Sequence, residues 1–241
     1  MKEGAFWRGS AVRVFAVGGV LITAAAIALC TPWFDLVDLR EVVITGNRHA
    51  SAADLVSMSG LQRGQSLLAV SLRRVASNLM QHPWTKEVRL SRRLPHTLAI
   101  RVVEREEIAW MIDPSGDGCI TVGEEGVIVS AGCPHSTSLI ELQGARVSGG
   151  VGGTLADRPI VVLIDALRRE GLASLDVRRI DAADPESVVL DTGSDQRVLL
   201  GGLHNVASAV NALAALHRAH DLSDYEVVDL RFGGEATLVP R

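Results

Sequence analysis

Aromatic residues are scarce in this sequence: they make up 4% of 241 residues, and only one of them is a tyrosine. Proteins that bind single-stranded nucleic acid stack the bases on aromatic side chains, so this composition argues against that class of function. Cationic residues are also too few to balance the anionic ones, and the net charge is −9 over residues 108–241. The larger part of the molecule would therefore repel nucleic acid.

Signatures of catalytic and cofactor sites are missing as well. The chain has no G-x-S-x-G motif, and its glycine-rich segment GARVSGGVGG (144–153) lacks the strand–GxGxxG–helix order and the lysine of a phosphate-binding loop. His204, His217 and His220 stand without the cysteine or glutamate pattern that zinc requires. We therefore expect no enzyme activity, no metal and no cofactor.

One stretch lacks charge altogether, the apolar run VFAVGGVLITAAAIALCTPWF at residues 14–34. As a helix rising ~1.5 Å per residue it would extend about 30 Å, the thickness of a bilayer core. Basic residues precede the run and acidic residues follow it, so the positive-inside rule predicts a cytoplasmic segment at 1–13 and an extracytoplasmic remainder. Cleavage of a signal peptide after AIA (26–28) is the alternative, but the length of the run favours a membrane anchor.

Only two of the three cysteines, Cys119 and Cys133, lie outside that run. They flank ITVGEEGVIV, which has the pattern of a β-hairpin with glycines in its turn. In an oxidising compartment they could form a disulfide, or they could remain two buried thiols, and the sequence leaves both readings open. The net charge changes from +3 over residues 35–107 to −9 beyond them, which suggests a domain boundary near residue 107.

The segment from Leu39 to Val103 has the pattern strand, helix, helix, strand, strand. LREVVITGN alternates in polarity as a strand does, and Ser51 and Asp54 form a capping box for a helix through Met58. A second helix, from Ser71 to Gln81, has apolar residues at i, i+3, i+4 and i+7. KEVRLSRRLPHTLAIRVVER then predicts two strands joined at residues 93–96.

These residues carry a resemblance to a known family. Ile44 to Asn47 (I-x-G-N), Pro83-Trp84, the run R-x-x-P-x-x-L-x-I at 92–100 and Glu104-Arg105 resemble the POTRA domain of the FtsQ/DivIB family of bacterial cell-division proteins. The resemblance implies an α+β chain with four parts. These are a cytoplasmic N-terminus (1–13), a transmembrane helix (14–34), a β-α-α-β-β POTRA domain (35–107) and a β-rich C-terminal domain with two helices (108–241).

The resemblance also implies a function, that of a non-enzymatic scaffold at the division septum. Such proteins sit in the inner membrane with a single crossing and bind small coiled-coil partners, the FtsB/DivIC-like and FtsL-like proteins, while the POTRA domain contacts other division proteins. The alternatives are an accessory of a cell-wall hydrolase or transpeptidase, and a POTRA-type chaperone for exported chains.

The C-terminal segment YEVVDLRF (225–232) predicts a strand at the edge of the sheet, to which a partner chain adds by β-augmentation. Alternation would place Val228, Leu230 and Phe232 against the core. The expected partner-binding residues are Tyr225, Val227, Asp229, Arg231 and Phe232. The resemblance implies that Arg231 pairs with an acidic residue of the partner. A second arginine of the family is absent here, because Gly201-Gly202 stands where the family often has Gly-Arg. An alternative is that residues 236–239 fold back and cover this edge.

Overall fold

The computed structural model describes residues 37–116, 118–134, 138–169, 172–232 and 235–241. The chain divides into two compact units, which we describe separately. Unit 1 contains the described residues up to Met80 together with Glu87–Val103, and unit 2 contains Gln81–Lys86 and Glu104–Arg241. The apolar run at 14–34 lies outside the described residues, and no helix within them has the length and apolar character needed to cross a bilayer.

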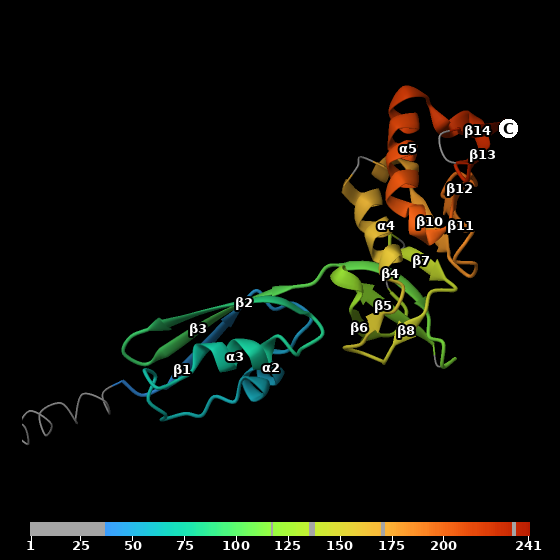
Figure 1. The fold of residues 1–241 in the computed structure, drawn as a ribbon. Helices are drawn as coiled ribbons and strands as arrows, with labels where there is room; N and C mark the ends of the chain where they lie inside the picture. The colour runs from blue at the N-terminus through green and yellow to red at the C-terminus, as the bar shows by residue number, and fades with distance from the viewer. Residues whose placement is uncertain (1–36, 117, 135–137, 170–171, 233–234) are drawn as a thin grey trace, which may run out of the picture. The chain divides into compact units, whose positions relative to one another are not determined.

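Unit 1 has the predicted order of a strand, two helices and two strands (Figure 1). Its elements are β1 (Glu41–Thr45), α2 (Ala52–Ser59), α3 (Leu72–Leu79), β2 (Thr85–Arg93) and β3 (Thr97–Glu104). The sheet order is β1-β3-β2, and β1 runs parallel to β3. The expected β-α-α-β-β arrangement is therefore confirmed.

Both helices of unit 1 begin where the sequence predicts. The side chains of Ser51 and Ser71 accept hydrogen bonds from the backbone N–H groups of Asp54 and Arg74, and so satisfy donors that a helix leaves unpaired in its first turn. Gly46 follows β1 with a φ of +89°, and any side chain there would collide with the carbonyl oxygen of Val102. The glycine of the I-x-G-N motif is therefore required by the packing of β1 against β3.

Unit 2 is built on a mixed sheet in the order β14-β13-β12-β11-β10-β7-β4-β5-β6. Its strands are β4 (Glu107–Ile112), β5 (Cys119–Gly123), β6 (Ile128–Ala131), β7 (Ile140–Gln143), β10 (Val177–Asp181), β11 (Val188–Thr192), β12 (Arg197–Gly201), β13 (Tyr225–Asp229) and β14 (Thr237–Pro240). A separate hairpin pairs β8 (Val147–Ser148) with β9 (Thr154–Leu155).

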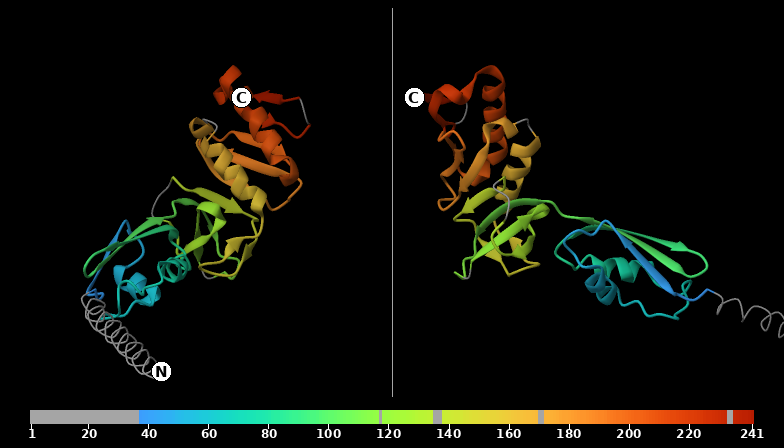
Figure 2. Two further views of the ribbon diagram at one scale, coloured as in Figure 1. Left: turned by 60° about the vertical axis from the view of Figure 1, so that its left-hand side comes forward. Right: turned by 180° about the vertical axis from the view of Figure 1, so that it is seen from behind.

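Two helices, α4 (Arg158–Arg169) and α5 (Val206–Ala219), cover one face of this sheet (Figure 2). Buried residues of both helices form one core with a row of strand residues, Leu142, Ile180, Leu190, Val198 and Val228. Short 3₁₀ turns at Glu124–Gly126, Leu172–Leu175, Leu203–Asn205 and Leu222–Asp224 complete the unit. Helix α5 connects the parallel neighbours β12 and β13, and so delivers the last two strands to the end of the sheet.

The opposite face of the sheet is open and carries a second row of residues in register, which we call the cross-strand row. Its members are Trp110, Glu141, Arg179, Asp191, Arg197, Val227 and Val239. In the middle of the row, Arg179 lies 3.1 Å from the carboxylate of Glu141 and 3.8 Å from that of Asp191. Arg197 lies 3.7 Å from Asp191, so the four charges alternate in sign across four neighbouring strands.

Candidate partner-binding edge

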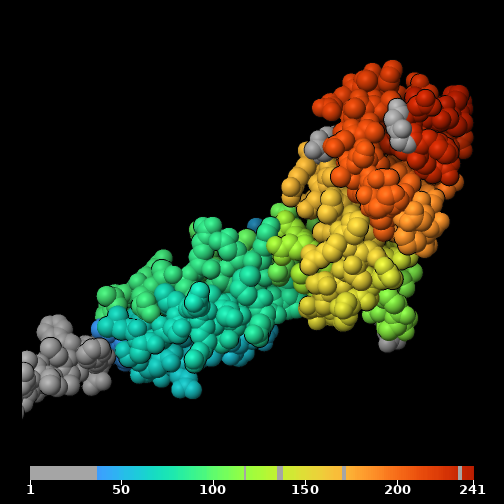
Figure 3. Space-filling view, in the orientation of Figure 1, coloured from blue at the N-terminus to red at the C-terminus, as the bar shows by residue number. Residues whose placement is uncertain are grey.

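The edge of the sheet is not where the sequence placed it. Strand β13 covers Tyr225–Asp229 only, and β14 pairs with it in antiparallel register, with Val227 opposite Val239 and Asp229 opposite Thr237. The prediction that residues 225–232 form the edge strand is therefore wrong, and the alternative in which the C-terminus folds back is confirmed. The edge strand is β14, whose segment lies at the surface of unit 2 (Figure 3).

The strand ends early because of Asp229. Its carboxylate accepts a hydrogen bond from the backbone N–H of Arg231 at 3.0 Å, which takes this donor out of the ladder. The backbone N–H of Glu235 then donates to the carbonyl oxygen of Phe232, and β14 begins at Thr237. A short aspartate-centred turn of this kind is hard to distinguish from a continuing strand, because DLRF has the composition of a strand.

The five predicted binding residues separate into two groups in the structure. Tyr225 is half-buried and packs against the core, and Val227 belongs to the cross-strand row on the open face. Asp229, the last residue of β13, comes together with Arg231 and Phe232, which follow the strand. Phe232, expected in the core, is 66% exposed, whereas Val228 and Leu230 are buried as predicted.

Asp229 and Arg231 form a two-pronged ion pair. The guanidinium Nε and Nη2 atoms donate to the two carboxylate oxygens of Asp229 at 3.0 and 2.7 Å. The hydrogen bond from Arg231 holds the pKa of the Asp229 carboxyl below its ordinary value, and partial burial opposes this shift. The Arg231 guanidinium also lies 5.5 Å from the ring centroid of Phe232. An exposed aromatic ring and an oriented cation are thus presented together beside the edge strand.

This ion pair predicts a pH-dependent effect of Arg231→Ala. Because the pKa of Asp229 is depressed in the folded protein, its stabilising contribution is present above the ordinary carboxyl pKa and is lost as the pH falls through the folded value. Arg231→Ala should therefore lower the free energy of unfolding more at pH 7 than at pH 3, where less of the carboxylate is charged. Urea unfolding at both pH values measures this, with Asp229→Asn as the matched control. An effect of equal size at both pH values would contradict it.

Gly202 stands at the position where family members often carry a second arginine. Gly201 has a φ of +79°, and a Cβ built there would lie 3.6 Å from Cγ of Arg231, so the Arg231 side chain extends over it. A Cβ at Gly202 would lie 2.5 Å from the imidazole of His204. The resemblance to the family therefore does not extend to a second cation at this position, where glycines let Arg231 and His204 approach the backbone.

The opposite edge of the sheet, β6, is covered. The backbone N–H of Ile128 donates to the carbonyl oxygen of Gly153, and that of Gly152 donates to the carbonyl oxygen of Ile128. By contrast, β14 has no strand on its outer side within the described residues. Thr237 and Val239 are exposed, and Pro240 and Arg241 end the strand. Of the two edges in the described part of unit 2, only β14 offers an uncovered row of backbone donors and acceptors.

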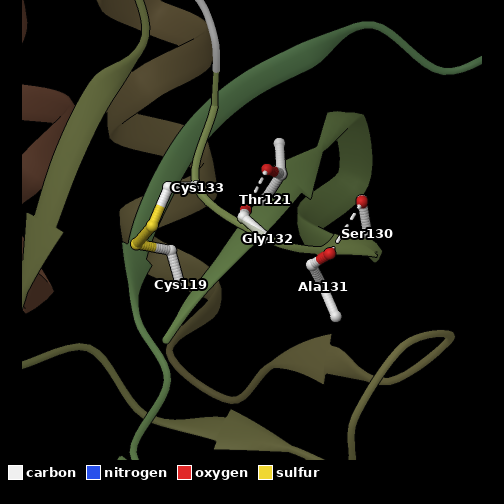
Figure 4. Close-up of a disulfide and its surroundings, with 6 residues drawn as sticks. All are labelled: Cys119, Thr121, Ser130, Ala131, Gly132 and Cys133. Carbon is white, nitrogen blue, oxygen red and sulfur yellow. Dashed lines mark hydrogen bonds between the residues drawn. A yellow bond between two sulfur atoms is a disulfide. The ribbon is translucent and has the colours of Figure 1, made fainter. Parts of the chain in front are cut away.

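Cys119 and Cys133 are joined by a disulfide, with their Cα atoms 4.6 Å apart (Figure 4). Cys119 is the first residue of β5, and Cys133 follows β6, so the bond closes the open end of the hairpin. The backbone N–H of Gly132 donates to the carbonyl oxygen of Cys119 at 2.7 Å, and the hydroxyl of Thr121 donates to the carbonyl oxygen of Gly132 at 3.3 Å. The disulfide thus fastens β6, the strand at the far edge from β14.

The histidines singled out in the sequence do not converge. His217 Nε2 lies 2.7 Å from the hydroxyl of Ser174, and His204 lies 3.7 Å from the carboxylate of Glu186. Among the residues that the structure describes, no group of three or more His, Cys, Asp or Glu side chains could hold a metal ion. The C-terminal edge is therefore the strongest candidate for function in the described chain.

The family model for FtsQ-type POTRA domains matches residues 37–105, which span β1 to β3. The cell division protein FtsQ of Corynebacterium glutamicum is 25% identical over 193 residues, 78% of this chain and 83% of that protein. FtsQ of Rickettsia bellii is 32% identical over 107 residues, 44% of this chain and 39% of that protein. DivIB of Clostridium acetobutylicum is 26% identical over 136 residues, 56% and 51% of the two chains.

The chain contains an FtsQ-type POTRA domain and is similar to FtsQ and DivIB cell-division proteins. The predicted resemblance to the FtsQ/DivIB family is confirmed. The match to the FtsQ-type POTRA model ends at residue 105, so the C-terminal edge lies outside the range of that model. The similarity to the corynebacterial FtsQ extends further, over most of both chains, whereas the matched segments span about half or less of the rickettsial and clostridial relatives.

Proposed function

We propose that this protein is a non-enzymatic scaffold of the division septum that captures its partners at the β14 edge. The observation that carries the proposal is the uncovered edge of β14 beside an exposed Phe232 and an oriented Arg231. An extended partner segment would add as a tenth strand, with backbone hydrogen bonds providing affinity. FtsB/DivIC-like and FtsL-like coiled-coil proteins are the proposed partners.

The side chains around the edge would supply specificity. A hydrophobic residue of the partner would cover Phe232, which is 66% exposed in the free chain. An acidic residue of the partner would share the guanidinium of Arg231 with Asp229, because the planar guanidinium has five N–H donors and only part of them is used by one carboxylate. Val239 of β14 and Val227 of β13 would border the added strand on the open face.

Site-specific photo-crosslinking in dividing cells tests this proposal. A crosslinker at Val239 is expected to trap a small coiled-coil division protein, whereas one at Val162, an exposed residue of α4, should not. If neither site traps such a protein, or if Val162 traps it as efficiently as Val239, the proposed edge is wrong.

We further propose the domain ranges 35–107 and 108–241 and a single membrane crossing by residues 14–34. The charge-free run preceded by basic residues supports this topology. The protein would then lie in the inner membrane at the septum, with its bulk outside the cytoplasm, where its POTRA domain contacts other division proteins.

Topology has its own test. A reporter that is active only in the cytoplasm should be inactive when it is fused after Arg241 and active when it is fused before Met1. An active C-terminal fusion would overturn the crossing, and with it the extracytoplasmic placement of both units.

A further inference from the structure

One end of unit 1 gathers the loops that lie next to the start of the described chain. The backbone N–H of Leu67 donates to the carbonyl oxygen of Val37 at 2.8 Å, and that of Leu39 donates to the carbonyl oxygen of Gln65 at 2.8 Å. On the other side, His96 in the β2–β3 turn contacts Asp38, with 2.8 Å between Nδ1 and the carboxylate. Two loops therefore flank residues 37–39. We call this part of unit 1, residues 37–40, 64–70 and 92–96, the entry end.

The two loops are also fastened to each other. The guanidinium of Arg92 donates from Nε to the carbonyl oxygen of Leu67 at 2.9 Å and from Nη2 to that of Val70 at 2.6 Å. Figure 1 shows the β2–β3 turn at the end of unit 1 where β1 begins. The entry end is thus one connected surface rather than two independent loops.

The entry end carries the two most exposed large hydrophobic side chains of unit 1. Leu94 is 64% exposed and Leu68 is 49% exposed, compared with 43% for Met80, the next in order. Leu94 lies at the tip of the β2–β3 turn, directly after Arg93, which is also exposed and has no ion-pair partner within the described residues. Exposed leucines beside unpaired arginines are typical of surfaces that enter a lipid headgroup layer.

The few residues between the apolar run and unit 1 indicate what this surface contacts. The apolar run ends at Phe34, only four residues before Asp38. An extended chain spans at most about 3.6 Å per residue, so Asp38 lies within roughly 14 Å of the end of the proposed membrane anchor. Both exposed leucines are on loops that contact residues 37–39 directly. The bilayer is therefore the apolar phase nearest to them.

We propose that the entry end rests on the extracytoplasmic leaflet of the membrane, with Leu68 and Leu94 inserted among the headgroups and Arg93 bound to an anionic lipid phosphate. Asp38 does not oppose this contact, because its carboxylate forms an ion pair with Arg40 and lies 2.8 Å from His96 Nδ1. Among the described residues of this end, Glu41 is a further acidic group, and its carboxylate accepts a hydrogen bond from Thr97. The inference rests on the proposed membrane anchor, and it would hold unit 1 at a fixed orientation to the bilayer.

Fluorescence quenching of the full chain in lipid nanodiscs tests the inference. Single labels are placed by Leu94→Cys, Leu68→Cys or Met80→Cys in a Cys30→Ser background, while Cys119 and Cys133 stay bonded without reductant. Met80 is the matched control, because it is an exposed apolar residue at the far end of α3 from the entry end. In discs containing phosphatidylglycerol, labels at 94 and 68 should be several-fold less accessible to aqueous iodide than the label at 80.

The lipid contact of Arg93 has its own readout. Arg93→Glu, or discs of phosphatidylcholine alone, should increase iodide access at position 94, whereas Arg73→Glu on α3 should not. Equal access at 94 under all these conditions would overturn the phosphate contact. Equal access at 94, 68 and 80 would overturn the membrane-facing assignment itself.

A label on the native Cys30 separates this inference from the anchor on which it rests. Cys30 lies within the apolar run, so a quencher attached to lipid acyl chains should reach its label. If it does, and the labels at 94 and 68 are fully aqueous, the inference alone fails. If the Cys30 label is itself aqueous, the proposed anchor fails and the inference fails with it.

Discussion

Loss of the Cys119–Cys133 disulfide is expected to lower the free energy of unfolding of unit 2 by about 3 kcal/mol. The reason is that the bond joins cysteines 14 residues apart and so restricts the conformations of the unfolded chain. The double variant Cys119→Ala/Cys133→Ala should show this loss in urea unfolding monitored by tryptophan fluorescence. Trp110 on β4 lies directly opposite Thr121 of β5, so it reports on this region. The loss is a large fraction of the stability of an ordinary domain.

Reductant distinguishes the cross-link from the side chains. The native chain in reductant should unfold at the urea concentration at which the double variant unfolds, and reductant should have no effect on that variant. If the native chain unfolds at the same urea concentration with and without reductant, the disulfide contributes no stability and the prediction is wrong.

A pair of proline variants in β14 is expected to separate partner binding from folding. Successive backbone N–H groups of a strand point to opposite sides, so one of Leu238 and Val239 donates toward β13 and the other donates outward. Proline removes the donor at its own position and places a ring there. The variant that loses the outward donor should weaken partner binding by about tenfold or more and leave thermal unfolding unchanged. The variant that loses the inward donor should lower the unfolding temperature.

Co-expression with the FtsB/DivIC-like protein of the same organism, followed by co-purification and thermal unfolding of both variants, measures this difference. Leu238→Ala and Val239→Ala are the matched controls, since they keep both backbone donors. If both proline variants bind the partner as the native chain does, no strand adds to β14. If both lose binding and stability together, the edge has no function separable from folding.

Unit 1 follows from the sequence because its signals are local. Ser51 and Ser71 cap helices through contacts three residues away, and the apolar spacing from Leu72 to Leu79 identifies the buried side of α3. Gly46 is a partial exception. Its motif is visible in the sequence, but the reason for it, the carbonyl of Val102 from β3, appears only when distant strands pair.

The C-terminal edge could not be derived in the same way. Both β13 and β14 have strand composition, and the sequence cannot say which of them is outermost, because sheet order depends on contacts between distant residues. The Asp229–Arg231 pair was visible as two charges two residues apart. Only the structure shows that they bind each other and end β13, and that they leave Phe232 exposed.

The alternating charges of the cross-strand row have a consequence for how strands find their alignment during folding. A one-residue slip of β11 would turn Asp191 toward the helices and Leu190 toward water, so burial alone rejects it. A two-residue slip keeps every side chain on its proper face, and burial cannot reject it. Such a slip would carry Asp191 away from both Arg179 and Arg197, so that Asp191 and Arg197 lose these contacts and Arg179 keeps only Glu141. The charged residues of the row therefore disfavour sheets with a two-residue register shift, which the burial of hydrophobic side chains alone would tolerate.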